Sequence, residues 1–189
     1  MGKKYKDMAK AIFEMFEMTR TPRSGWQRVG VRNGIENNAE HNCLTIQIAF
    51  ILALMEKVDN PEKTACIAFF HDNAEPRTGD QNKINAQYFD KTEGERRAFD
   101  DFTNRLPGRI KGVLLGYMDE YKGKESVHAI IVKDADLLQM GFQAKYYLSI
   151  GFKHAQKYLD TAGEGLQTKS AKRIYKSMLE TEFYEWSLE

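Results

Sequence analysis

Apolar residues recur at helical spacing along nearly the whole chain, and the two-residue alternation typical of strands is scarce. This periodicity limits the possible folds more than any other feature of the sequence. It predicts helices over about Lys6–Thr19, Asn38–Val58, Thr92–Leu106 and Arg109–Tyr121. We therefore expect an all-α protein in which about six to eight helices form one compact bundle.

Residues that start or break helices set the limits of another element. Asn60-Pro61 offers an N-cap followed by proline at the first helical position. The helix that begins there is expected to continue until Thr78-Gly79 ends it. On this prediction the C-terminal part of one continuous helix carries His71, Asp72 and Glu75.

The same signals define three further segments. Ser126 can cap a helix that runs from Val127 to about Tyr147. A final amphipathic helix is expected from Ser170 to Trp186. The stretch Thr21–Ile35 contains one proline and three glycines, and is expected to be a long loop.

The totals favour one globular domain. The chain of 189 residues has the usual length of a domain, and no repeat or linker divides it. We expect a single domain over residues 1–189, with the chemistry-bearing part over about 20–143 and the C-terminal helices of 144–189 packed on it. The formal net charge of +1 argues against binding to a nucleic-acid polymer, which needs a concentrated basic face. A small charged substrate remains possible.

The sequence also favours a cytoplasmic protein that does not enter a membrane. The longest apolar run, Ile48–Met55, is too short to cross a bilayer. Charges interrupt the apolar pattern of the N-terminal MGKKYKDMAKAIFEMF, which is unlike a signal peptide. The two cysteines, Cys43 and Cys66, form no disulfide framework and are expected to be buried free thiols.

The pair His71-Asp72 is the first indication of chemistry. It follows the strongly apolar segment Ala65–Phe70, where an ionised aspartate beside a histidine is costly unless a partner compensates it. A divalent cation is one such partner, because imidazole nitrogens and carboxylate oxygens suit Zn, Mn, Co or Fe. The alternative is a solvated polar helix end, and for an isolated His-Asp pair that is the better interpretation.

Two further residues favour the metal interpretation. Glu75 follows His71 by four residues, so in a continuous helix its carboxylate would lie on the same face. His41 falls on the apolar face of the preceding helix and is expected to point inward. A core histidine that is simply hydrogen-bonded is the alternative for this residue.

Charges also interrupt the otherwise apolar helix Ala129–Met140, in the run Lys133-Asp134-Ala135-Asp136. Buried charges need partners, and a metal ion is one candidate. Periodicity alone does not choose between Asp134 and Asp136, and charges that face solvent are equally compatible with the pattern.

His41, the doublet His71-Asp72 and a distant aspartate form the pattern H…HD…D, in which the chain resembles the HD superfamily of metal-dependent phosphohydrolases. Four ordered blocks within about two thirds of the chain (roughly Arg20–Gln143) carry a closer resemblance to the 5′-deoxynucleotidase branch. They are Thr21-Pro22-Arg23-Ser24-Gly25-Trp26 beside R-(S/T)-G-W, Asn38-Ala39-Glu40-His41 beside V-A-E-H, HDNAEPRTGD (His71–Asp80) beside HDxxExxTGD, and VKDADLLQM (Val132–Met140) beside VKDxDxLEM.

The resemblance implies a metal site. It places one divalent ion (Mn, Co, Zn, Mg, Fe or Ni) on two histidines and two aspartates. It selects Asp136 over Asp134, because the ligand in the family follows the lysine by three residues. Asp134 would then lie behind the ligands or at the surface. The implied ligands are His41, His71, Asp72 and Asp136.

The resemblance also implies roles in catalysis and substrate binding. Glu75 would be the catalytic acid or base, and Arg23 would orient the phosphate for catalysis. Trp26 would form a wall of the substrate pocket, and Asp80 would contact the sugar. The residues implied to contact the substrate are Arg23, Trp26, Asp80, His41 and Asp72.

Two departures from the family pattern leave the substrate preference open. After Asp80 the relatives continue with an apolar, proline-containing stretch, whereas this chain has Gln81-Asn82-Lys83. Arg23 and Trp26 are separated by two residues, whereas the bacterial enzymes have an adjacent Arg-Trp.

We expect a phosphohydrolase that converts (deoxy)ribonucleoside 5′-monophosphates to nucleoside and phosphate. One alternative is an HD enzyme that acts on a triphosphate, a cyclic nucleotide or a pyrophosphorylated nucleotide. Another is a non-catalytic nucleotide-binding domain. The resemblance further implies a homodimer.

Overall fold

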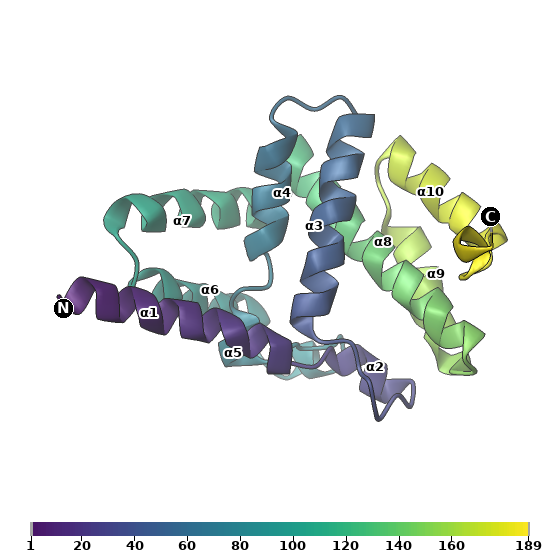
Figure 1. Cartoon of the computed structure of the whole chain (residues 1–189), viewed down its shortest axis with the longest axis horizontal. Helices are drawn as coiled ribbons and strands as arrows, with labels where there is room; N and C mark the ends of the chain where they lie inside the picture. Colours follow the sequence, from purple (N-terminus) through teal and green to yellow (C-terminus); the bar gives the residue numbers. More distant parts are fainter. Residues whose placement is uncertain (1, 189) are drawn as a thin grey trace.

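The computed structural model describes residues 2–188, which contain ten α-helices and no β-strand. The expected all-α fold is confirmed, and one isolated bridge between Pro22 and Asn37 is the only strand-like pairing in the described part. Eight of the ten helices have at least ten residues. The helices (Figure 1) are α1 (Lys3–Phe16), α2 (Ser24–Arg28), α3 (Asn38–Met55), α4 (Pro61–Phe70), α5 (Glu75–Thr78), α6 (Lys91–Thr103), α7 (Gly108–Gly123), α8 (Val127–Ser149), α9 (Gln156–Gly165) and α10 (Lys169–Glu180).

Helix α8 is the centre of the packing, in contact with α3, α4, α7, α9 and α10 (Figure 1). Its side chains Ile131, Val132 and Leu138 are buried against Leu52 of α3 and Ile67 of α4. Full burial of side chains of this size contributes about 1.5–3 kcal/mol each. A second group of buried side chains joins α1, α6 and α7, and a third joins α2, α8 and α9.

Caps fix where the two helices that carry site residues begin. The Asn37 side chain accepts hydrogen bonds from the backbone N–H groups of Ala39 and Glu40, and the Glu40 side chain accepts one from the Asn37 N–H. This capping box holds the start of α3 in place. Ser126 caps α8 as expected, by accepting a hydrogen bond from the Ala129 N–H.

The prediction of one continuous helix from Pro61 to Thr78 is wrong. Helix α4 ends at Phe70, a turn follows, and α5 begins at Glu75. In the turn, the Glu75 N–H donates a hydrogen bond to the Asp72 carbonyl. Because the helix is interrupted, the relative directions of the His71, Asp72 and Glu75 side chains do not follow from helical spacing.

Three other boundaries differ from expectation. The predicted loop over 21–35 contains the short helix α2. Helix α9 was not predicted from the sequence. The last helix ends at Glu180, and Trp186 lies beyond it in the 3-10 turn Glu185–Ser187 with 75% of its surface exposed.

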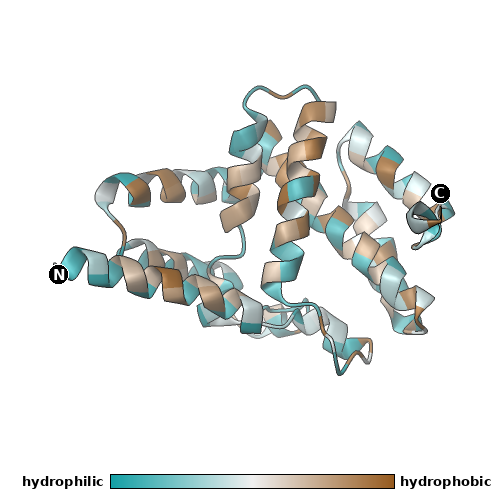
Figure 2. Ribbon diagram, viewed as in Figure 1, coloured by the Kyte–Doolittle hydropathy of each residue, from teal (hydrophilic) through white to brown (hydrophobic). Residues whose placement is uncertain are grey.

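Cys43 and Cys66 are exposed, so their expected burial is wrong. Cys43 lies in α3 and Cys66 lies in α4, and hydrophobic residues extend along much of each helix (Figure 2). Apolar neighbours on all sides of a helix do not indicate which side faces the core, and this explains the error. Within residues 2–188, no helix combines the length and the hydrophobicity needed to cross a membrane.

Candidate metal centre and active site

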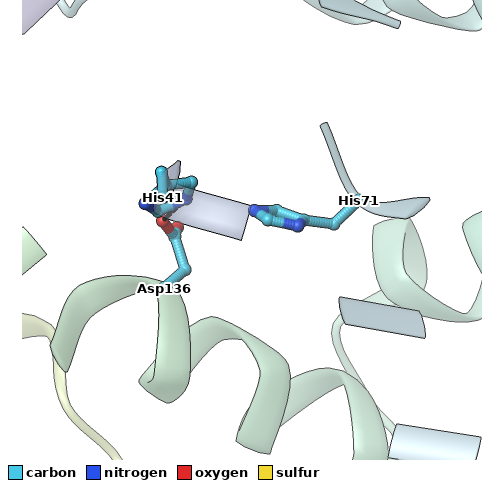
Figure 3. Close-up of side chains that lie close together, drawn as sticks. All are labelled: His41, His71 and Asp136. Carbon is cyan, nitrogen blue, oxygen red and sulfur yellow. Dashed lines mark ion pairs between the residues drawn. The ribbon is translucent and has the colours of Figure 1, made fainter. Parts of the chain in front are cut away.

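Side chains from three distant segments converge beside α8. His41 lies in the first turn of α3, His71 and Asp72 lie in the turn after α4, and Asp136 lies within α8. Figure 3 shows the His41 ring over the Asp136 carboxylate, with the His71 ring directed toward them from the other side. The structure therefore brings together the four residues that the family resemblance implies as ligands.

The distances within this cluster are short. The His41 Nε2 atom lies 3.4 Å from Asp136 Oδ1 and 3.6 Å from Asp72 Oδ2. The His71 Nε2 atom lies 3.2 Å from Asp72 Oδ2. Ligand atoms of His41, His71 and Asp136 all lie within 4.8 Å of one another. One cation can therefore be reached by all four side chains after small adjustments.

Both imidazole rings turn Nε2 toward the cluster. The Nδ1 atom of His71 lies 2.7 Å from the Ala68 carbonyl, which only accepts, so Nδ1 carries the proton. Its buried Nε2 has no hydrogen-bond partner among the described residues. A buried nitrogen lone pair without a donor is costly in an apolar interior and suits a metal ligand.

His41 is oriented by a buried hydrogen-bond chain that the sequence analysis did not predict. Its Nδ1 lies 2.5 Å from Gln139 Oε1, and the Gln139 amide N–H donates to Glu36. The Trp26 indole N–H donates to the other Glu36 oxygen at 2.7 Å. Because Gln139 uses its N–H on Glu36, its oxygen accepts from the Nδ1–H of His41, and Nε2 is the ring nitrogen that faces the cluster. The spacing of three residues after Asp136 on α8 was the one available signal for Gln139.

Arg23 lies among the acidic side chains. Its guanidinium nitrogens are 3.2 Å from Asp72, 3.3 Å from Asp80, 3.9 Å from Glu75 and 4.0 Å from Asp136. Burial alone would lower the pKa of Arg23, but these carboxylates outweigh it and raise the pKa above its ordinary value. The guanidinium is thus a permanent positive charge beside the cluster.

Both candidate aspartate ligands are held in the ionised form. Burial by itself would raise the pKa of Asp72, but the adjacent His71 ring and the Arg23 guanidinium outweigh it and keep the pKa well below its usual range. For Asp136 the opposing groups are Lys133, whose Nζ is 2.7 Å away, and His41. Ionised carboxylates are the form that binds a cation.

Glu75 behaves in the opposite way. It is 1% exposed, and burial, followed by the negative charges of Asp72 and Asp80, raises its pKa well above the ordinary value. Arg23 and Lys91 oppose this rise only in part. A carboxyl group with a raised pKa beside ionised carboxylates holds a proton more readily than an exposed carboxyl group does.

Asp80 and Trp26 occupy places that the sequence analysis did not foresee. Asp80 accepts hydrogen bonds from the Ser24 backbone N–H at 2.5 Å and from Arg23, so it ties the start of α2 to the site. Trp26 is 3% exposed and packs against Tyr147 and Tyr158. Its indole is therefore core in this structure and offers no open pocket wall.

Asp134 lies neither behind the cluster nor at the surface, which corrects that expectation. It is fully buried on another face of α8. Its two oxygens accept hydrogen bonds from the backbone N–H groups of Gln167 and Thr168, at 2.8 and 2.7 Å. These bonds hold the segment that leads into α10.

A cavity of about 220 Å³ adjoins the cluster at His71, between α6 and α7. Its walls combine apolar and charged side chains. They include Ala74, Phe99, Leu115 and Met118, with Glu95, Asp119 and Lys122.

Comparisons with known proteins agree with this geometry. The HD domain family matches residues 17–178. The human 5′-deoxynucleotidase HDDC2 is 29% identical over 154 residues, which cover 78% of this chain and 73% of that protein. The mouse protein of the same name is 29% identical over 172 residues, with coverage of 88% and 83%.

Solved structures agree as well. A protein from Pyrococcus horikoshii superposes with a TM-score of 0.77 and is 26% identical, with coverage of 90% of this chain and 97% of that one. The family match spans most of the chain and includes every residue of the cluster. On this evidence, the chain belongs to the HD domain family.

Proposed function

We propose that this chain is a metal-dependent phosphohydrolase that releases phosphate from nucleoside 5′-monophosphates, with deoxyribonucleotides as the favoured class. The observation that carries the proposal is the convergence of two imidazole Nε2 atoms and two ionised carboxylates beside a buried, protonatable Glu75. The names of the human and mouse relatives support the substrate class.

The proposed ligands of one divalent cation are His41, His71, Asp72 and Asp136. Membership in the HD family implies such a cation, and the unpartnered Nε2 of His71 fits one. Two imidazoles and two carboxylates would suit a borderline ion such as Mn, Fe, Co or Zn, and an ion of higher coordination number would also have room for water and substrate. The cation supplies a Lewis acid, which activates water near neutral pH and withdraws charge from a phosphoryl group.

Glu75 is the proposed acid–base group. Its raised pKa favours the protonated form, and a carboxylic acid in that position can protonate the leaving 5′-oxygen. In its ionised form it can instead accept a proton from the attacking water. This exchange requires the carboxyl group to be held in one place.

Arg23 is the proposed phosphate-binding residue. Its planar guanidinium suits two oxygens of a phosphate, and its charge persists at every physiological pH. In the structure the guanidinium contacts Asp72 and Asp80, and Asp80 also holds the start of α2. Arg23 is thus directed toward the cluster before any substrate arrives.

The cavity beside His71 is the proposed location of the nucleoside. Its apolar walls suit a base, and Glu95 and Lys122 can hydrogen-bond to the base edges. Filling it with Leu115→Trp is expected to raise KM for nucleotides and leave the hydrolysis of a small phosphomonoester unchanged. Equal KM values for nucleotides in this variant and the wild type would remove the cavity from the proposal.

The function is tested by phosphate release from a panel of substrates in the presence of Mn, Co, Mg or Zn. The panel contains ribo- and deoxyribonucleoside 5′-monophosphates, triphosphates and cyclic nucleotides. We expect turnover of the monophosphates, fastest with the deoxy forms. Turnover of only triphosphates or cyclic nucleotides would assign the chain to another branch of HD enzymes. Nucleotide binding without phosphate release under any metal would indicate a non-catalytic domain.

A further inference from the structure

The Glu75 carboxyl group is held by different partners on its two oxygens. The Asn38 side-chain N–H group donates to Oε2 at 2.5 Å. The Lys91 ammonium lies 3.5 Å from Oε1. Asn38 comes from the start of α3 and Lys91 from the start of α6, so the two partners approach from separate helices.

Asn38 is rigidly placed and has no other evident task. It is fully buried, and its backbone N–H donates to the Thr21 carbonyl at 2.9 Å. The adjacent capping box is made by Asn37 and Glu40, so the Asn38 side chain is not needed to start α3. Its Oδ1 has no hydrogen-bond partner among residues 2–188. An unpaired buried oxygen costs stability, which argues that the amide is present for its contact with Glu75.

Lys91 balances the charge on the other side. Its ammonium is shared between Glu75 at 3.5 Å and Glu95 at 3.3 Å. The Lys91 side chain is 35% exposed whereas that of Glu75 is 2% exposed, so the ammonium reaches inward from the edge of the site. A cation there favours the ionised form of Glu75 and limits the movement of the carboxylate.

We infer that Asn38 and Lys91 are positioning residues that hold the two oxygens of Glu75. The inference rests on the proposed role of Glu75 as the acid–base group. Asn38 also stands where the V-A-E-H pattern has valine, while Ala39, Glu40 and His41 match it. Neither residue is proposed to contact the reacting atoms, so loss of either contact is expected to slow turnover without abolishing it.

The first test replaces Asn38 by the valine of the pattern. Asn38→Val is expected to lower kcat by about tenfold with KM within about twofold of the wild type, because Glu75 is less well placed while substrate binding is intact. Lys91→Met is expected to lower kcat in the same way. Unchanged kcat in both variants would overturn the inference.

Asn42 supplies a matched control. It lies one turn later on α3, is also buried, also has an unpartnered Oδ1, and donates at 2.7 Å to the Phe69 carbonyl rather than to Glu75. Asn42→Val is expected to change thermal stability in the same range as Asn38→Val and to leave kcat within about twofold. An equal loss of kcat in both variants would mean that Asn38 acts only through packing.

A double-mutant cycle tests whether Asn38 acts through Glu75. In a Glu75→Gln background, Asn38→Val is expected to have no further effect on the residual rate. A further tenfold loss in that background would contradict the inference.

Crystal structures give a readout that does not depend on activity. In the wild type we expect the Asn38 amide within hydrogen-bond distance of Glu75, and in Asn38→Val we expect the Glu75 carboxyl group displaced or spread over two rotamers. An unmoved, well-ordered Glu75 in the variant would overturn the inference. If the wild type hydrolyses no phosphomonoester, the proposed function fails, and these structures still decide whether Asn38 places Glu75.

Discussion

Asp134 and Asp136 lie on different faces of helix α8, separated by one residue, and they have opposite surroundings. Asp134 is fully buried, and both of its oxygens accept backbone N–H groups of the segment before α10. Asp136 has a side chain that is 15% exposed, and it faces His41 and Lys133.

These surroundings distinguish a carboxylate that stabilises the fold from one that is available to a ligand. A carboxylate that accepts two backbone donors has its hydrogen-bonding capacity used by the fold, and stabilises it. The Asp136 carboxylate lies beside the His41 Nε2 atom and accepts no backbone N–H group among residues 2–188. A cation can bind both the carboxylate oxygen and the imidazole nitrogen. We therefore expect Asp134 to matter for stability and Asp136 for metal binding and turnover.

The largest expected effect is that of Asp136→Asn. The variant should lose the bound cation and lower kcat/KM by at least about 10³-fold, because one ionised ligand is removed. Elemental analysis and phosphate release measure the two effects. Metal content equal to that of the wild type would show that Asp136 is not a metal ligand.

The next largest effect is expected for Glu75→Gln. The variant should keep its metal and lose about 10²–10⁴-fold in kcat, because general acid–base catalysis contributes an effect of that size. Elemental analysis alongside single-turnover kinetics tests it. Retained turnover would show that Glu75 is not the acid–base group.

Gln139→Leu changes a residue that contacts His41 and is not itself one of the proposed ligands. It removes the acceptor of the His41 Nδ1 proton and is expected to weaken metal binding by about 10–100-fold, since partners of this kind orient metal-binding histidines. Calorimetric titration of the metal-free protein with Zn or Mn measures the affinity. An unchanged affinity would show that His41 needs no such support.

The smallest effect on turnover is expected for Asp134→Ala. Loss of two charge-assisted hydrogen bonds should lower the free energy of unfolding by about 3 kcal/mol and the Tm by roughly 6–12 °C. At a temperature where the variant is folded, kcat and metal content should match those of the wild type. Loss of metal at that temperature would contradict the structural role of Asp134.

Much of the fold follows from local signals, and where those signals are ambiguous the prediction fails. Ser126 and the break at Pro107-Gly108 are unambiguous, and the helices around them are found as expected. Glu75 stands at helical spacing from His71, so spacing concealed the turn at 71–74 that follows the end of α4. The exposed Cys43 and Cys66 lie in helices with apolar residues on several sides, where sequence spacing does not define the buried face.

The site residues were likewise predicted where a local signal exists and missed where it does not. Ligand candidates were found because charged residues in apolar helices are unusual and because the motif blocks lie in a recognisable order. The supporting residues Glu36, Asn38 and Gln139 were missed, because their partners lie far away along the chain. A polar residue in an apolar helix indicates that a partner exists, and only the tertiary structure shows which one.

We propose that one cation is shared by His41, His71, Asp72 and Asp136. Anomalous diffraction from crystals grown with Mn tests it most directly. We expect a single ion bonded to all four side chains at about 2.0–2.3 Å. An ion bound elsewhere, or no ion at this cluster at saturating Mn, would contradict it.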